Sequence, residues 1–329
     1  HNKILQVVHE FYDTDLTLAR VDQLADISLK HGINTTLSPL FVDRNNAAGA
    51  QKIVERVAER TARGARVWPQ VQTRPIDISF NFSVPSLLFV RLPKWYALMR
   101  FNEPEQIMAS LEDQNTRKTL IAEAQGMMPL WNNLVLRQVV SEANQELVGK
   151  TLKEIAALRQ SDALNVMIDL SLEESLEAHF LSADMGHNDD ALVAPLLKHP
   201  NVMIGASDGG AHILSFATYG DTGYLLGHFV RDTAHLGLEA AVKKITADPA
   251  NLWGMGNRGM LREGFIADIS VFDESVVDRG AEYFVQDVPG DGYRYVRDAH
   301  GIHSVVIGGA LAYDKANGYY EAHRGQVIG

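Results

Sequence analysis

An apolar segment that ends in Ser207-Asp208-Gly209-Gly210 holds the side chain of this sequence best suited to chemistry. In α/β barrels the catalytic groups stand at the carboxyl ends of buried parallel strands. Asp208 would stand at such an end, and the two glycines let the backbone pass close to a ligand. The same pattern also suits a turn in which Asp208 caps the next helix. We predict that Asp208 is catalytic, with helix capping as the alternative.

Two neighbours of Asp208 are candidates for binding a substrate. His212 follows four residues later, where its imidazole could hydrogen-bond the Asp208 carboxylate or a substrate carboxylate. Its alternative is an ordinary surface histidine. Ser207 is also predicted to contact the substrate. His187, His228 and His235 are expected to be solvated or satisfied by hydrogen bonds.

Earlier in the chain, His9 and Arg74 follow apolar, strand-like segments. An imidazole at the end of a strand, such as that of His9, is chemically able to bind a divalent metal such as Zn²⁺. The alternative for His9 is a buried histidine hydrogen-bonded to a carbonyl. Arg74 could pair with a substrate carboxylate through two parallel hydrogen bonds, although structural ion pairing is the commoner fate of such an arginine. The chain has no cysteine, so a metal would be bound by His, Asp or Glu.

The elements that would position these residues alternate between strand and helix. Apolar residues at helical spacing, bounded by glycines and β-prone runs, separate the predicted elements. The sequence predicts strands at 4–11, 34–41 and 65–73, helices at 16–31 and 48–63, a later helix at 161–175, a strand at 177–182, and a helix at 189–198 before the Asp208 strand. Such alternation is typical of βαβ units and a parallel sheet.

Residues 81–149 interrupt the alternation with an aromatic-rich, irregular stretch followed by helices. We interpret this stretch as an insertion over the mouth of a barrel that occupies 1–258. Residues 259–329 would form a small β-sandwich segment. Strands are expected at 267–272 and 304–309, with Asp268 at a strand edge or turn and outside the active site.

The carboxyl-terminal third carries the motif Gly-x-Leu-x-x-Gly-x-x-Ala-Asp-Ile-x-Val-Phe-Asp over 259–273. This motif resembles the closing segment of the amidohydrolase superfamily. The segment His199-Pro200-Asn201-Val202-Met203-Ile204-Gly205-Ala206-Ser207-Asp208-Gly209 is similar to the N-acyl-D-amino-acid deacylase branch. The resemblance is strong over 199–329 and weak before it.

The resemblance implies a partial (β/α)₈ barrel with a carboxyl-terminal β-sandwich, and metal-assisted hydrolysis of a small amide such as an N-acyl amino acid. One Zn²⁺ or similar ion would be bound by His9 and Asp208, and Asp208 would move the proton. Ser38-Pro39 stands where the branch has a second histidine. This departure favours an alternative, a related protein that binds a ligand or partner without hydrolysing it.

The expected barrel is incomplete within this sequence. A full barrel needs eight strands, and the pattern predicts about four or five before Asp208. The superfamily's His-x-His motif is also absent. We expect an amino-terminal segment to be missing or supplied by another chain, and the open sheet edges to promote homo-oligomer formation. A smaller α/β fold, similar to the superfamily only at its end, is the alternative.

Composition limits the class of partner. The formal net charge of −11 over 329 residues disfavours nucleic acid and anionic membranes. No run approaches the roughly 20 apolar residues that span a bilayer. A cytoplasmic location is therefore the default expectation, while a small-molecule substrate is implied only by the resemblance.

Overall fold

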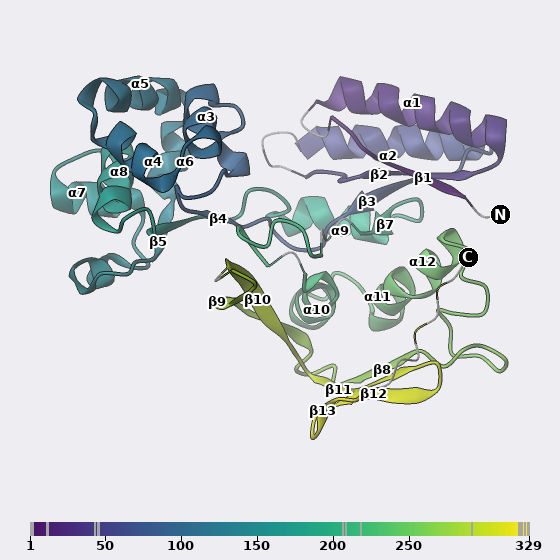
Figure 1. The fold of residues 1–329 in the computed structure, drawn as a ribbon. Helices are drawn as coiled ribbons and strands as arrows, with labels where there is room; N and C mark the ends of the chain where they lie inside the picture. Colours follow the sequence, from purple (N-terminus) through teal and green to yellow (C-terminus); the bar gives the residue numbers. More distant parts are fainter. Residues whose placement is uncertain are drawn as a thin grey trace.

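Figure 1 shows the computed structural model, which describes residues 3–10, 13–42, 44, 47–205, 207, 209–217, 219–290, 292–321, 325 and 327. Its three parts are a parallel sheet covered by helices, a mainly helical subdomain, and antiparallel strands near the carboxyl end. None of the described helices is long and apolar enough to cross a membrane.

The parallel sheet has the order β1-β2-β3-β7. Its strands are β1 (Ile4–Val8), β2 (Asn34–Ser38), β3 (Val67–Val71) and β7 (Met203–Ile204). Val8 pairs with Ser38, and Val71 pairs with Ile204, so the carboxyl ends of neighbouring strands lie at one edge. The predicted βαβ organisation is confirmed.

Helices cover this sheet. They are α1 (Thr14–His31), α2 (Ala47–Ala62), α9 (Asp190–Lys198), α11 (Leu238–Ile245) and α12 (Ala247–Leu252). Helix α1 begins where the Asp13 side chain accepts a hydrogen bond from the Leu16 amide, and it ends at Gly32, whose φ of 64° suits glycine. Buried aliphatic side chains of α1, α2 and α9 form one core with the sheet.

The expected number of strands in this sheet needs correction. Three strands, not four or five, precede β7 in it. The predicted strand at 177–182 forms β6 (His179–Ser182), which pairs antiparallel with β4 (Ile78–Phe80) and β5 (Val135–Gln138). Periodicity detects a strand, but the partner of a strand depends on contacts distant in sequence.

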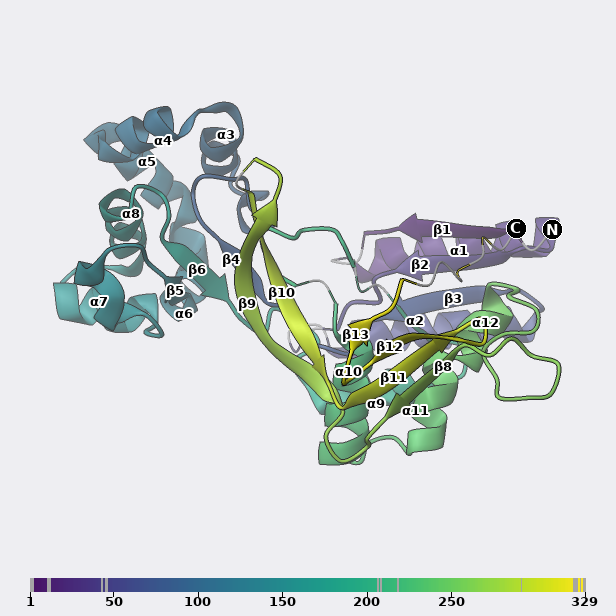
Figure 2. The same ribbon diagram turned by 60° about the horizontal axis from the view of Figure 1, so that its bottom comes forward.

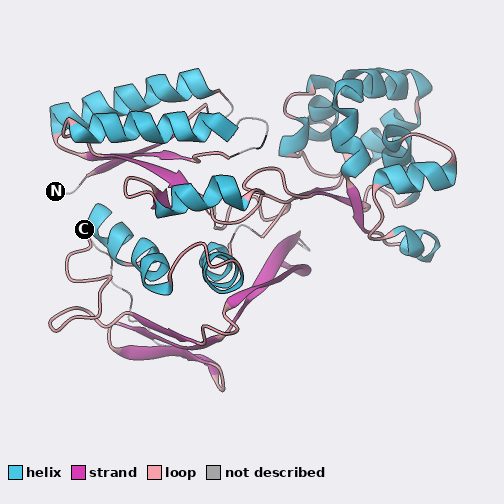
Figure 3. Cartoon of the chain, turned by 180° about the vertical axis from the view of Figure 1, so that it is seen from behind, coloured by secondary structure: helices cyan, strands magenta, loops and turns pink. Residues whose placement is uncertain are grey.

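The helical subdomain has its own hydrophobic core. It contains α3 (Pro93–Phe101), α4 (Pro104–Glu112), α5 (Gln114–Ala124), α6 (Met128–Asn133), α7 (Leu152–Arg159) and α8 (Ala163–Glu173). Trp95 and Trp131 are fully buried, and their indole N–H groups donate to the carbonyls of Leu120 and Ala124, each at 2.8 Å. Figure 3 shows this subdomain beside the helix-covered sheet, and the predicted insertion at 81–149 falls within it.

The carboxyl-terminal strands form two antiparallel groups. One is the hairpin of β9 (Asp278–Val288) and β10 (Gly292–His300). The other has the order β13-β12-β11-β8, with β8 (Ile269–Phe272), β11 (Ile302–Ile307), β12 (Ala310–Asp314) and β13 (Gly318–Tyr319). Figure 2 shows the hairpin extending from this sheet toward β4 and β6.

The predicted strands at 267–272 and 304–309 are confirmed by β8 and β11, which pair with each other. Asp268 lies just before β8, pairs with Arg258 and accepts a hydrogen bond from the Gly308 amide at 2.8 Å. Asp268 therefore lies at a strand edge, as predicted.

A short helix packs the hairpin against the rest of the chain. Helix α10 (Asp221–Tyr224) continues into a π-helical turn at Leu225–Asp232. A Cβ atom added at Gly223 would lie 2.8 Å from the Asp278 carbonyl carbon. Glycine therefore permits the close approach of α10 to β9.

A candidate site at the carboxyl edge of the parallel sheet

The candidate residues follow the parallel strands at one edge of the sheet. His9 comes directly after β1, and Ser38 ends β2. Arg74 follows β3, and Ser207 follows β7. Asp208 itself lies outside the described residues, so its catalytic role stays a prediction.

His9 is 6% exposed, and its ring is hydrogen-bonded to the backbone of Ser38. Burial lowers its pKa below the ordinary value of 6.5, although the hydrogen bond acts in the opposite direction. His9 therefore stands at the expected strand end, in contact with the next strand. Its role as a metal ligand stays a prediction.

Arg74 is 2% exposed, and its guanidinium group donates to three oxygens of the protein. Nε lies 3.2 Å from Oδ2 of Asp221, one terminal nitrogen lies 3.3 Å from the Ser207 carbonyl oxygen, and the other lies 3.3 Å from the Pro75 carbonyl oxygen. The Phe216 ring lies 5.9 Å from the guanidinium carbon. Arg74 therefore forms an internal ion pair, which is the alternative considered for it, and its role in substrate binding stays a prediction.

His212 is exposed and has a φ of 53°. Its ring stacks on Phe216 at 5.6 Å between centroids. The Ser207 hydroxyl accepts a hydrogen bond of 3.4 Å from the Gly209 amide. Arg74 thus contacts Ser207 directly, and Phe216 lies between Arg74 and His212. The substrate-binding roles of Ser207 and His212 stay predictions.

His187 differs from the expectation of a solvated or satisfied histidine. It is 2% exposed, and neither ring nitrogen has a hydrogen-bond partner among the described residues. Burial, and to a smaller extent the neighbouring positive charge of Arg74, together lower its pKa to about 3. His187 is therefore neutral beside the buried arginine. A cavity of about 390 Å³ extends from it past Pro75 to Tyr224 and His228.

Asp221 contacts the candidate site at this edge of the sheet, but the sequence analysis did not single it out. Its carboxylate pairs with Arg74, and its backbone carbonyl accepts a 2.8 Å hydrogen bond from the Thr73 hydroxyl. The only local signal is its place after Gly220 at the start of a helix, which is typical of many surface aspartates. The pairing with Arg74 joins residues that lie far apart in the sequence.

The described residues do not by themselves fit a metal centre. Catalytic zinc sites use three protein ligands. Within the described ranges, no group of three His, Cys, Asp or Glu side chains is placed to bind an ion. His9 is one imidazole at this edge, and β2 ends in Ser38 where a second imidazole would stand.

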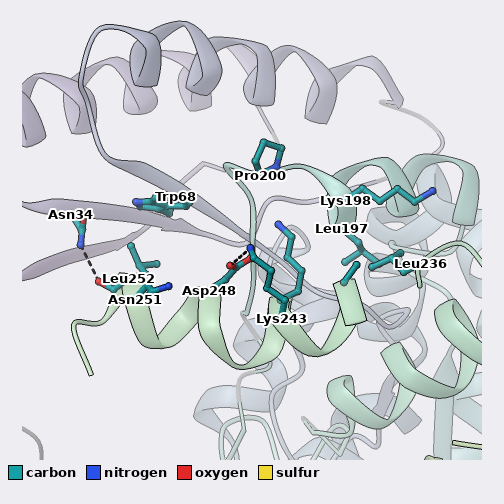
Figure 4. A pocket seen from close by; sticks show the side chains of 12 residues that line it. Asn34, Trp68, Leu197, Lys198, Pro200, Leu236, Lys243, Asp248, Asn251 and Leu252 are labelled. Atoms are coloured by element: carbon teal, nitrogen blue, oxygen red, sulfur yellow. Dashed lines mark hydrogen bonds and ion pairs between the residues drawn. The ribbon is translucent and has the colours of Figure 1, made fainter. Parts of the chain in front are cut away.

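A separate cavity lies at the opposite edge of the sheet. Figure 4 shows this cavity of about 640 Å³, with Asn34 at the start of β2 and Trp68 near the start of β3. Asn34 donates a 2.9 Å hydrogen bond to the Leu252 carbonyl, and Lys243 pairs with Asp248 at 2.5 Å. Because catalytic groups of such folds stand at the carboxyl ends of the strands, we do not assign the chemistry to this cavity.

Comparison with known proteins gives the family. The sequence model of the Amidohydrolase family matches residues 105–313. The chain belongs to this family. The amidohydrolase resemblance seen in the sequence is thereby confirmed.

Curated relatives narrow the comparison. The chain is 31% identical over 185 residues to D-aminoacylase of Alcaligenes xylosoxydans xylosoxydans, a match covering 56% of this chain and 34% of the relative. It is 32% identical over 185 residues to N-acyl-D-glutamate deacylase of the same organism, covering 55% and 34%. This amidohydrolase chain thus spans about a third of the length of the curated relatives it matches.

Solved structures show the likeness of the fold. A crystal structure of D-aminoacylase superposes with a TM-score of 0.55 at 20% identity, covering 98% of this chain and 55% of the other. N-acyl-D-glutamate deacylase from Bordetella bronchiseptica, complexed with zinc and a phosphonate inhibitor, superposes with a TM-score of 0.52 at 21% identity, covering 92% and 52%. Another D-aminoacylase structure, described in connection with the binuclear metal centre of that enzyme, superposes with a TM-score of 0.56 at 20% identity. The match covers 98% of this chain and 55% of the other.

Proposed function

We propose that this chain forms part of a hydrolase that cleaves the carbon–nitrogen bond of N-acyl amino acids. Family membership and the identity to D-aminoacylase support a hydrolase of small amides. The observation that carries the proposal is the gathering of His9, Arg74 and Ser207 after strands β1, β3 and β7 at one edge. In barrel enzymes this edge carries the chemistry.

Asp208, the residue after Ser207, is the proposed proton carrier. Its carboxylate would accept a proton from the water that attacks the amide carbonyl carbon. The carbon–nitrogen bond then breaks, and the same proton passes to the leaving amine. A carboxylic acid and a free amino acid are the products, and the aspartate returns to its ionised form.

Two neighbouring residues are proposed to bind the substrate. His212 is exposed, so its ring is accessible to a ligand. A histidine ring can donate a hydrogen bond to the carboxylate of an amino acid. Ser207 offers a hydroxyl at the strand end, next to the proposed proton carrier. A divalent ion bound by His9 and Asp208, such as one Zn²⁺, remains part of the hypothesis.

The function is tested on the full hydrolase of which this chain forms part, with a panel of N-acetyl-D- and N-acetyl-L-amino acids and with release of free amino acid as the measurement. Elemental analysis of the same protein measures bound zinc, and the His9→Ala variant reports whether His9 contributes to binding. The hypothesis expects turnover of at least one N-acyl amino acid. No release from any member of the panel would contradict it.

A second function is favoured by Ser38. The Ser38 backbone is hydrogen-bonded to His9, so serine rather than a second imidazole stands beside His9 at the end of β2. A barrel with fewer metal ligands could bind an N-acyl amino acid without cleaving it. Calorimetric titration with the same panel separates the two cases, because binding without product release would support the second function.

A further inference from the structure

The loop that joins β7 to α10 is bound near both ends by one buried side chain. Arg74 donates to the Ser207 carbonyl at 3.3 Å and pairs with Asp221 at 3.2 Å. Ser207 lies near the start of the loop, and Asp221 begins α10. We propose that Arg74 is a positioning residue that holds the loop carrying Asp208 and His212, rather than a residue that binds the substrate carboxylate.

The environment of Arg74 suits this role. Its side chain is 2% exposed, and the Asp221 side chain is 8% exposed. Removing one partner of a buried ion pair strongly destabilises the folded protein, because the other charge is left buried without compensation. The Thr73 hydroxyl also binds the Asp221 backbone at 2.8 Å, so two consecutive residues after β3 hold the start of α10. Outward movement of Arg74 toward a substrate would break all three of its hydrogen bonds.

The middle of the loop is held by other elements. The Ser79 amide donates to the Ser215 carbonyl at 2.7 Å, and the Tyr295 amide donates to the Ile213 carbonyl at 2.9 Å. These contacts come from β4 and β10. Loss of the Arg74 contacts should therefore loosen mainly the segment from Ser207 to His212, which comes before the residues held by β4 and β10. Phe216 packs against both Arg74 and His212, at 5.9 Å and 5.6 Å respectively.

The planar shape of the guanidinium group determines which substitution of Arg74 tests the positioning role. A guanidinium group presents donors in several directions of one plane, whereas a lysine has one ammonium nitrogen. Arg74→Lys keeps the charge beside Asp221 but cannot reach Asp221, Ser207 and Pro75 in the same geometry. Asp221→Asn keeps an acceptor oxygen and removes the ion pair. Arg117→Lys is the matched control, because Arg117 is also a mostly buried arginine, 14% exposed, that pairs with Asp169 in the helical subdomain.

Hydrogen exchange measured by mass spectrometry on the peptide spanning 205–221 tests the positioning role without reference to activity. We expect Arg74→Lys and Asp221→Asn to raise the exchange rate of this peptide by roughly tenfold, while Arg117→Lys leaves it unchanged. Unaltered exchange in both Arg74→Lys and Asp221→Asn would overturn the inference. Should Arg74→Lys fail to fold, Asp221→Asn alone decides.

The effect of Arg74 on catalysis rests on the proposed function, and it is measured by steady-state kinetics. Misplacement of a catalytic group by about 1 Å can cost roughly 10²-fold in rate. We expect Arg74→Lys to lower kcat by roughly that factor with little change in KM. A rise in KM at unchanged kcat would instead show that Arg74 binds the substrate, and would overturn the inference. An inactive wild-type protein would contradict the proposed function, whereas hydrogen exchange would still test the loop contact.

Discussion

The Tyr295 hydroxyl lies 2.7 Å from Nδ1 of His179, which joins the carboxyl-terminal hairpin to the antiparallel sheet of the helical subdomain. His179 is 1% exposed, and its other ring nitrogen lies 3.4 Å from the Asn81 side-chain amide. Arg137 stands over the Tyr295 ring at 4.4 Å and pairs with Glu282 at 2.6 Å. Polar contacts therefore connect the hairpin to the subdomain.

Tyr295→Phe should reduce the free energy of unfolding by about 1–3 kcal/mol, because it leaves a buried ring nitrogen of His179 without its partner. Urea unfolding followed by circular dichroism measures the loss. Tyr319→Phe is the control, since Tyr319 is 90% exposed, and its effect should stay within about 0.5 kcal/mol. Equal stabilities of the two variants would show that the hydrogen bond contributes nothing.

Acid should destabilise the fold through two buried histidines. Burial lowers the pKa of His179 to about 4 and that of His187 to about 3, from an ordinary value of 6.5. Below pH 6.5 the unfolded chain binds protons that the folded chain does not, so the free energy of unfolding falls as the pH drops toward 4 and 3. Above pH 6.5 this contribution is constant.

Each of these histidines contributes a slope of at most about 1.4 kcal/mol per pH unit in that window. Urea unfolding at pH 7.5, 6.0 and 5.0 measures the slope. His179→Asn and His187→Asn should each make it smaller, because one proton-binding site of the unfolded chain is gone; Asn also tolerates the φ of 53° at position 187. Wild-type slopes in both variants would contradict this account.

Asp208→Asn should lower turnover of an N-acyl amino acid by roughly 10²–10⁴-fold, because the amide cannot accept the proton. Asp248→Asn serves as the control, since Asp248 lies in α12 near the opposite edge of the sheet, where it pairs with Lys243 of α11. The control should retain turnover within a few-fold. Near-normal turnover in Asp208→Asn would remove the proposed role of this residue.

The outer strands of the parallel sheet should cause self-association of the 329-residue chain. Among the described strands, β1 pairs with β2 alone and β7 pairs with β3 alone. Val8 on β1 is 77% exposed. Unpaired edges with exposed apolar side chains favour edge-to-edge pairing, which a charged residue suppresses.

Sedimentation velocity measures this association. Val8→Lys should shift the distribution toward monomer, whereas Leu261→Lys should not, because Leu261 is 84% exposed but lies in a loop outside the strands. A wild-type chain that is monomeric at all concentrations tested would contradict the prediction.

The sequence by itself determined the local elements and the family. Helices α1 and α2 and strands β1, β2 and β3 lie within about three residues of their predicted bounds, because apolar periodicity and flanking glycines act over short distances. The motif over 259–273 predicted strand β8 correctly, and the amidohydrolase resemblance is confirmed by the family match. Asp208 was indicated by the sequence, and its role awaits experiment.

Only the tertiary structure decided which distant residues meet. The sequence identified a strand at 177–182 but not its antiparallel partners β4 and β5. It singled out Arg74 but not Asp221, the carboxylate that pairs with it. Burial of His187 likewise involves a residue distant in sequence, because its ring lies 5.6 Å from that of Phe41. Ion pairs and buried contacts of this kind are set by three-dimensional packing, for which residue type and spacing along the chain give no direct signal.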